Sequence, residues 1–220
     1  MEKTHFQFFV EELNQTMVLQ YKTIEILFEN QYGYPELDPV RAEICKCLVC
    51  GLNQAAITLT NHLLEMSLKT CLIFKYSKKN KGTNTDVFDW FDEGVKKYDS
   101  IDLGQSINAA CSVGLLTKPQ KLRLYDFREQ FRNAFSHGSL EKTFGDITAP
   151  VKVITTKDFN SIEELGKIAF DRNKDKSVKL TKLPMFRGIA QAMFAQQNSI
   201  PYFMEIDKII RTMLSNLKDK

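Results

Sequence analysis

The feature that most constrains the fold is a long segment, residues 38 to 76, whose hydrophobic side chains recur every three or four positions. This spacing matches the 3.6-residue turn of an α-helix. The segment opens with Asp38 and Pro39, a typical helix start, because proline fits a first helical position where its missing N–H is not needed. Its apolar side chains cover much of the circumference, so we expect a central helix, bent at Gly51 and surrounded by other helices.

The same periodicity predicts further helices on both sides of this segment. They cover residues 5–30, 85–98, 102–116, a helix that opens at Lys118 and Pro119, 186–197 and 201–217. We expect the last two to be separated by a break at residues 198–201, which contain Pro201. A chain of 220 residues is long enough for one sizeable core, so we predict a single domain over residues 1–220.

One part of the chain does not follow the helical pattern. Residues 151–156 are β-branched and partly alternating, and residues 177–181 are a candidate partner strand. Between them, Ser161 and Glu164 have the spacing of a capping box, which predicts a short helix towards Phe170. The predicted fold is therefore an all-α helical bundle with a small α+β or irregular insert near residues 144–183.

Composition and charge leave the partner of this bundle open. The net charge of +3 is too small to indicate nucleic acid by itself. No apolar run approaches the roughly 20 residues of a membrane span, and the N-terminus does not have the pattern of a leader peptide. The odd count of five cysteines then predicts reduced thiols in a cytoplasmic protein that does not act at a membrane.

Two groups of residues resemble metal ligands but are better explained otherwise. Cys45 and Cys47 point about 200° apart on a helix, so they cannot close on one ion. The acidic residues between Asp86 and Glu93 fall in the first turns of a predicted helix, where negative charge suits the helix dipole. We therefore expect neither a metal nor another cofactor.

The central helix carries one polar face, with residues three or four positions apart. Its members are Gln54, Thr58, Asn61, His62 and Glu65. One interpretation is hydrogen bonding between helices or a strip that faces solvent. The other is that the face lies against the helix that contains Arg132, with Glu65 or Asn61 orienting a functional side chain.

The strongest candidate for chemistry is the end of the helix that opens at Lys118. Arg128 and Arg132 lie one turn apart on it, His137 follows five residues after Arg132, and Gly138 is expected to end the helix. The negative end of the helix dipole favours a protonated imidazole there. An arginine that grips phosphate and a titratable histidine together suit phosphodiester chemistry.

Arg132, Asn133 and His137 form an Arg-Asn-x-x-x-His pattern that resembles the R-x4-H signature of HEPN domains. These are small helical bundles found in RNA-cleaving toxins and abortive-infection proteins, and the likeness would cover roughly residues 38–140 and the C-terminal helices. The resemblance implies Arg132, Asn133 and His137 as catalytic residues. It also implies a supporting polar residue on the neighbouring helix, for which Glu65 is the best candidate.

The expected function is metal-independent cleavage of RNA in a defence or toxin–antitoxin setting. General acid and general base together need two histidines, and a homodimer that joins two Arg132/His137 pairs supplies them. Asn61, Arg128 and Ser136 are expected to assist, and an antitoxin protein would be a further partner. The alternative is a non-catalytic helical module that dimerises and binds nucleic acid, a nucleotide or a partner protein, in which Arg132 and His137 only complement the helix dipole.

Overall fold

The computed structural model describes residues 4–79, 87–133, 148–151, 161, 176–179 and 187–218. Helices account for most of these residues, which confirms the predicted all-α class. In chain order the elements are α1 (His5–Glu29), α2 (Asp38–Val49), α3 (Asn53–Lys79), α4 (Val87–Tyr98), α5 (Leu103–Ser112), α6 (Lys118–Phe127), the π-helix η1 (Arg128–Asn133), β1 (Thr148–Val151), β2 (Lys176–Lys179) and α10 (Arg187–Lys218).

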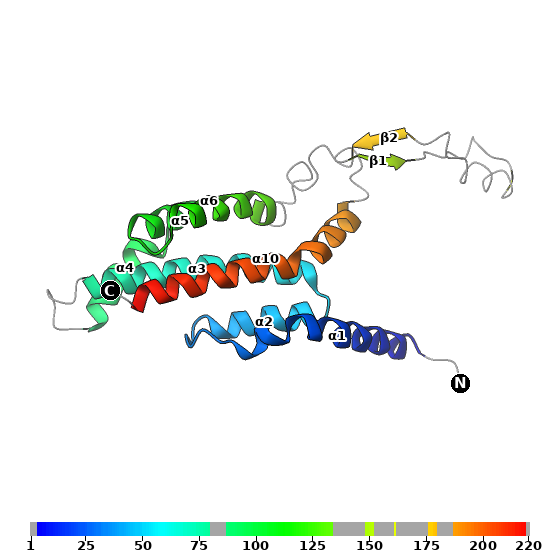
Figure 1. Ribbon diagram of the computed structural model, residues 1–220, viewed down its shortest axis with the longest axis horizontal. Coiled ribbons are helices and arrows are strands. Elements are labelled where there is room, and N and C mark those ends of the chain that lie inside the picture. Colours follow the sequence, from blue (N-terminus) through cyan, green and yellow to red (C-terminus); the bar gives the residue numbers. More distant parts are fainter. Residues whose placement is uncertain are drawn as a thin grey trace.

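The centre of the bundle is the pair of long helices α3 and α10, which pack side by side (Figure 1). α1 and α2 lie on one side of this pair, and α5 and α6 lie on the other. α4 packs against α3, where the rings of Phe74 and Phe91 meet edge to face at 5.4 Å. Fully buried core side chains come from each layer: Ile24, Leu48, Ile57, Leu68, Ile107, Phe203 and Ile210.

The segment predicted as one bent helix over residues 38–76 is in fact two helices. α2 ends at Val49 and α3 begins at Asn53. Gly51 between them has a φ of +70°, a left-handed conformation that ends a helix instead of bending it. A Cβ at this position would lie 3.0 Å from Cγ2 of Thr16 in α1, so the turn is also closely packed.

The predicted break at residues 198–201 is wrong, because α10 runs through it with Pro201 inside the helix. α10 changes direction in its first half, as expected where proline removes one helical hydrogen bond (Figure 1). Side chains just before the proline make two further hydrogen bonds: Asn198 donates to the carbonyl of Phe194 at 2.8 Å, and Ser199 donates to Oδ1 of Asn53 in α3 at 2.6 Å. Packing against α3 thus outweighs the local preference of proline.

The position of Asp38 before Pro39 predicts that it caps α2, but its side chain does not do so. The N-cap of α2 is Leu37, which makes no side-chain capping bond. The Asp38 carboxylate instead accepts hydrogen bonds from the backbone N–H groups of Tyr32, Gly33 and Tyr34, at 2.7, 2.9 and 3.0 Å. It thereby fixes the loop between α1 and α2.

α1 is packed against the bundle in only part of its length. It begins with a capping box formed by Thr4 and Gln7, and it contacts α2. Ile24 and Leu27, near its end, are buried, but Phe6 and Phe9 near its start are 71% and 59% exposed. The apolar face predicted for this helix therefore lies partly in solvent.

β1 and β2 form an antiparallel pair, with Thr148 opposite Lys179 and Val151 opposite Lys176. Both strands fall inside the predicted insert at residues 144–183, although the first begins three residues before the predicted start at Val151. The helix predicted after Ser161 lies outside the described residues.

The cysteines behave as core residues in two cases. Cys45 and Cys71 are buried, and burial raises the pKa of the Cys71 thiol to about 12.

Within the described ranges, no group of three or more His, Cys, Asp or Glu side chains is placed to hold a metal ion. None of the helices described is long and apolar enough to cross a membrane.

Candidate functional site

Arg128 and Arg132 lie on η1, a π-helical segment that directly continues α6. α6 begins as the sequence predicts, with Pro119 in its first turn, and a capping box between Thr117 and Gln120 fixes its start. A π-helix hydrogen-bonds residues five apart, and such segments occur frequently at functional sites. The irregular geometry therefore falls on the segment that carries the two arginines.

One face of η1 is anchored by aromatic packing. The ring of Phe131 stacks on Tyr202 of α10 with centroids 3.9 Å apart and planes 5° apart. Phe127 meets the same tyrosine edge to face at 5.1 Å, and the Tyr202 hydroxyl donates to Oδ1 of Asn61 at 2.7 Å. Burial raises the pKa of Tyr202, so this hydroxyl stays a donor. Tyr202 thus joins η1, α10 and α3.

Arg132 lies beside Glu65 of α3. Nη2 of Arg132 is 3.7 Å from Oε2 of Glu65, and Nζ of Lys69 is 3.2 Å from Oε1 of the same carboxylate. The side chains of Arg132 and Glu65 are each 29% exposed. The carboxylate of Glu65 thus attracts and orients the guanidinium of Arg132 while it also pairs with Lys69.

Arg128 lies next to Asp102, the N-cap of α5. A Cβ on Gly104 would be 3.1 Å from Nη1 of Arg128, so the guanidinium packs closely on the first turn of α5. The pKa of Asp102 is lowered, first by the backbone N–H of Gln105 and further by the positive charges of Arg128 and Arg132. The Nε of Arg128 is buried and has no hydrogen-bond partner among the described residues.

These groups make a small basic cluster with a slight excess of positive charge. Lys69, Arg128 and Arg132 are cationic, and Glu65 and Asp102 are anionic, so three charges oppose two. A cluster of this kind can bind a phosphate while its carboxylates hold the arginines in place.

The structure brings together some of the predicted site residues and separates others. Glu65, Arg128 and Arg132 form the cluster. Asn61 does not reach it, because its side chain faces Tyr202, and its buried Nδ2 has no partner in the part of the chain that the structure describes. Asn133 is the last residue of η1, and Ser136 and His137 lie outside the described residues.

The polar face of α3 is therefore divided between the two interpretations. Asn61 makes a hydrogen bond between helices, Gln54, Thr58 and His62 are exposed, and Glu65 lies beside Arg132. Asp102 was not foreseen as a member of the cluster. Its capping-box spacing with Gln105 is a signal in the sequence, but it predicts a helix start and not a neighbour of Arg128.

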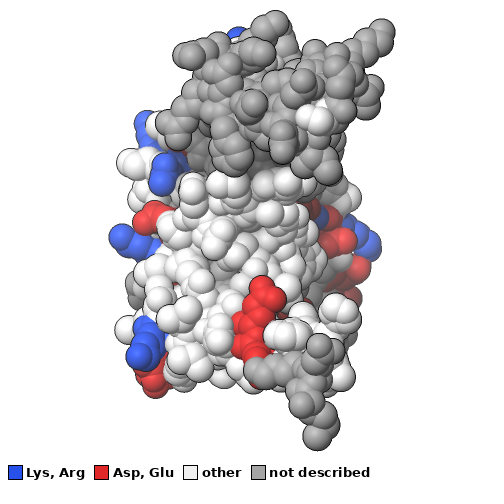
Figure 2. Space-filling model, turned by 90° about the vertical axis from the view of Figure 1, so that its right-hand side faces the viewer, with Lys and Arg blue, Asp and Glu red and all other residues white. Residues whose placement is uncertain are grey.

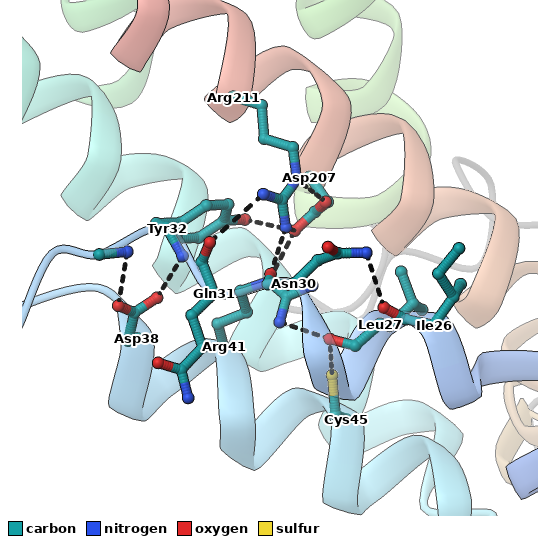
Figure 3. A network of polar contacts seen from close by, with 11 residues as sticks. Ile26, Leu27, Asn30, Gln31, Tyr32, Asp38, Arg41, Cys45, Asp207 and Arg211 are labelled. Carbon is teal, nitrogen blue, oxygen red and sulfur yellow. Dashed lines mark hydrogen bonds and ion pairs between the residues drawn. The ribbon is translucent and has the colours of Figure 1, made fainter.

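A second polar network, also not foreseen, surrounds the buried Asp207 of α10 (Figure 3). Asp207 accepts hydrogen bonds from Nε of Arg41 at 2.8 Å, from the Tyr32 hydroxyl at 2.7 Å and from Nε of Arg211 at 2.7 Å. Burial, and then the charge of Asp207, raises the pKa of Tyr32, so this hydroxyl remains protonated. The sequence contained one signal for this network: the carboxylate of Asp207 lies between the apolar residues Ile206 and Ile210 of the same helix.

This second network holds the fold together. Arg41 also donates to the carbonyl of Leu27 at 2.5 Å, and Arg211 donates to the carbonyl of Asn30. The end of α1, the following loop, α2 and α10 are thus joined through one carboxylate. We therefore assign the Asp207 network to stability and the Arg132 cluster to the candidate site.

Comparison of the chain with protein-family models, with curated proteins and with solved structures finds no match. The case for a function consequently depends on the residues themselves.

Proposed function

We propose that the chain is a metal-independent endoribonuclease of HEPN type that cleaves RNA as a homodimer in a defence or toxin–antitoxin setting. The observation that carries the proposal is the Arg132 cluster. A partly exposed guanidinium is oriented by Glu65, stands beside a second arginine, and precedes a histidine by five residues in the sequence. Arginine next to histidine suits the stabilisation and proton transfers of phosphodiester cleavage.

The proposed reaction uses the ribose 2′-OH as the nucleophile. His137 of one protomer takes the 2′-OH proton, and the 2′ oxygen attacks phosphorus. Arg132 stabilises the negative charge of the phosphorane. His137 of the second protomer protonates the leaving 5′ oxygen, which gives a 2′,3′-cyclic phosphate and a 5′-OH end. Asn133 and Ser136 are proposed to hydrogen-bond the phosphate or the imidazole.

The end of the molecule where α1 and α10 begin offers a surface for a second copy. Figure 2 shows this end as largely uncharged, with most charged side chains at its margins. A cavity of about 790 Å³ opens there between α1, α3 and α10, and Leu52, Ile189 and Met193 in its lining are 56%, 61% and 56% exposed. Polar side chains, among them Gln20 and Gln196, share this lining. The two-histidine reaction makes a second copy the partner that we propose for this surface.

The test is incubation of the purified protein with mixed RNA in EDTA. We expect cleavage that leaves 2′,3′-cyclic phosphate ends. His137→Ala should lower the rate by about 100-fold to 10,000-fold, as for loss of a general acid or base. Arg132→Ala should lower it by about 100-fold or more, as for loss of transition-state stabilisation.

The matched control is Arg123→Ala, which removes an exposed arginine of α6 that stacks on Phe127 and stands outside the cluster. Its cleavage rate should stay near that of the unchanged protein. A folded dimer that cuts no RNA would reject the nuclease and favour the non-catalytic module that binds nucleic acid, a nucleotide or a partner protein.

A further inference from the structure

A cavity of about 610 Å³ lies where the last turns of α3 and α4 meet the end of α5. Its lining is basic and aromatic, and includes Lys75, Tyr76, Lys78, Lys79, Lys97 and Tyr98. No aspartate or glutamate is among the described residues that line it. The cavity is separate from the Arg132 cluster and takes no part in the chemistry proposed for it.

The charge of the lining is positive after the three helix ends are counted. The C-terminal ends of α3, α4 and α5 each carry a partial charge of about −0.5, or about −1.5 together. Lys78 donates to the carbonyl of Leu217 at 2.5 Å and so satisfies the end of α10. The charges of Lys75, Lys79 and Lys97 still exceed the partial charges of the three helix ends.

The two tyrosines form an aromatic corner next to one of these lysines. Their rings meet edge to face at 6.0 Å. Nζ of Lys97 is 4.7 Å from the centroid of Tyr76 and 5.4 Å from that of Tyr98. The nearby carboxylate of Glu93 is 3.5 Å from the hydroxyl of Tyr76, at the outer end of that ring. Tyr98 is only 9% exposed, so the ring surface of the corner is mainly that of the half-buried Tyr76, beside the Lys97 cation.

We propose that this cavity binds a nucleotide, with the phosphate held by Lys75, Lys79 and Lys97 and the base against the tyrosine corner. Lysine is a common phosphate ligand, and nucleic-acid bases stack on aromatic side chains with little dependence on sequence. A volume of about 610 Å³ lies within the range of small-molecule sites and would be mostly empty with inorganic phosphate alone. Only a ligand that has both a phosphate and a base would contact the lysines and the tyrosine rings together.

This ligand can be a free nucleotide or one nucleotide of an RNA strand. Glu65, Lys69, Tyr76 and Lys79 follow one face of α3 at helical spacing, and the ten residues from Glu65 to Lys75 rise by about 15 Å. Leu72, which lies between Lys69 and Tyr76 on this face, is only 1% exposed, so an RNA strand that reached from Arg132 to the cavity would pass over the residues packed on Leu72. The RNA source rests on the proposed function, whereas nucleotide binding does not.

Binding is measured on the full chain by titration with inorganic phosphate, with AMP and with a fluorescent single-stranded RNA of about eight nucleotides, all in EDTA. The test variants are Lys75→Ala/Lys79→Ala and Ser112→Glu, which places a negative charge in the exposed lining. The matched control is Lys22→Ala/Lys46→Ala, which removes two exposed lysines from α1 and α2. We expect both test variants to weaken AMP or RNA binding about tenfold or more, with no change in the control.

The results distinguish a free nucleotide from an RNA strand as the ligand. They also distinguish failure of nucleotide binding from failure of the proposed ribonuclease function. Tighter binding of AMP than of RNA indicates a free nucleotide, and tighter binding of RNA indicates a strand. The His137→Ala protein should bind as the unchanged protein does, so a lack of cleavage does not touch this proposal. It is overturned if neither AMP nor RNA binds at concentrations on the order of 1 mM, if phosphate binds as tightly as AMP, or if the control variant loses as much affinity as the test variants.

Discussion

Asp207 shows how much a single buried carboxylate can organise in this protein. It accepts hydrogen bonds from Arg41, Tyr32 and Arg211, and its side chain is only 8% exposed. Burying an ion pair is costly in itself, so the geometry of all three partners matters. Removal of the carboxylate leaves the 3% exposed Arg41 side chain without its counter-ion.

We predict that Asp207→Ala lowers the free energy of unfolding by about 3 kcal/mol or more, because it leaves an uncompensated buried charge. Urea unfolding followed by circular dichroism measures the change. Glu205→Ala, an exposed carboxylate in the same helix, is the control and should stay within about 0.5 kcal/mol of the unchanged protein. Equal losses in the two variants would contradict the assigned role of Asp207.

Asp102 makes the stability of α5 depend on pH. Its pKa is lowered in the folded protein, chiefly by the Gln105 backbone N–H. A lowered folded pKa gives stability that is present above the ordinary aspartate pKa, about 3.9, and is lost as the pH falls through the folded value. Asp102→Asn keeps a capping side chain but cannot ionise.

We therefore expect Asp102→Asn to be less stable than the unchanged protein at neutral pH, with a difference that shrinks in acid. The measurement is the free energy of unfolding in urea between about pH 7 and pH 3. Asp99→Asn makes the same charge change at an exposed position three residues earlier and should leave the pH dependence as it is. A gap between Asp102→Asn and the unchanged protein that widens in acid would have the wrong sign.

At the scale of elements, the turn between α2 and α3 is set by one glycine. Gly51 has a φ of +70°, and a Cβ there would meet Thr16 of α1 at 3.0 Å. Gly114, after α5, has a similar φ of +74°, but no atom of the described residues lies within 4 Å of its Cβ position. The two glycines thus share the backbone requirement and differ in the packing requirement.

Gly51→Ala should be more destabilising than Gly114→Ala. Both variants lose about 1–2 kcal/mol to the left-handed conformation, and Gly51→Ala additionally pushes against α1. Thermal and urea unfolding of the two variants measure the difference. If Gly114→Ala is the more damaging of the two, the close packing of α1 on this turn is not important.

The whole molecule is asymmetric in where it exposes apolar side chains. Ile189 and Met193 line the cavity between α1, α3 and α10, whereas Val95 is exposed on α4. If the surface around this cavity joins two copies, Ile189→Glu/Met193→Glu should give a monomer that remains helical and loses RNA cleavage, because a charge cannot be buried there without a partner.

Light scattering after size-exclusion chromatography measures the mass, and Val95→Glu is the control that should stay dimeric. A double variant that keeps the dimer would place the interface elsewhere. An unchanged protein that is monomeric at all concentrations would remove the two-histidine mechanism.

The sequence by itself determined the helical class and most helix starts, because these depend on local signals. Apolar spacing outlined the helices, and Pro119 marked the first turn of α6, but Gly51 was expected to bend a helix that it in fact ends. The Arg132 cluster could be predicted in part for the same reason: Arg128 and Arg132 share one helix, and Glu65 was singled out on α3 from its polar face.

The tertiary structure alone decided what depends on contacts between distant residues. α10 stays continuous through Pro201 because it packs on α3, Asp38 binds a loop and leaves its own helix uncapped, and Asn61 faces Tyr202. Asp102 beside Arg128, Asp207 among its three donors, and lysines of α3 and α4 around one cavity join residues far apart in the chain. Helical spacing describes the faces of one helix, and only packing determines which faces meet.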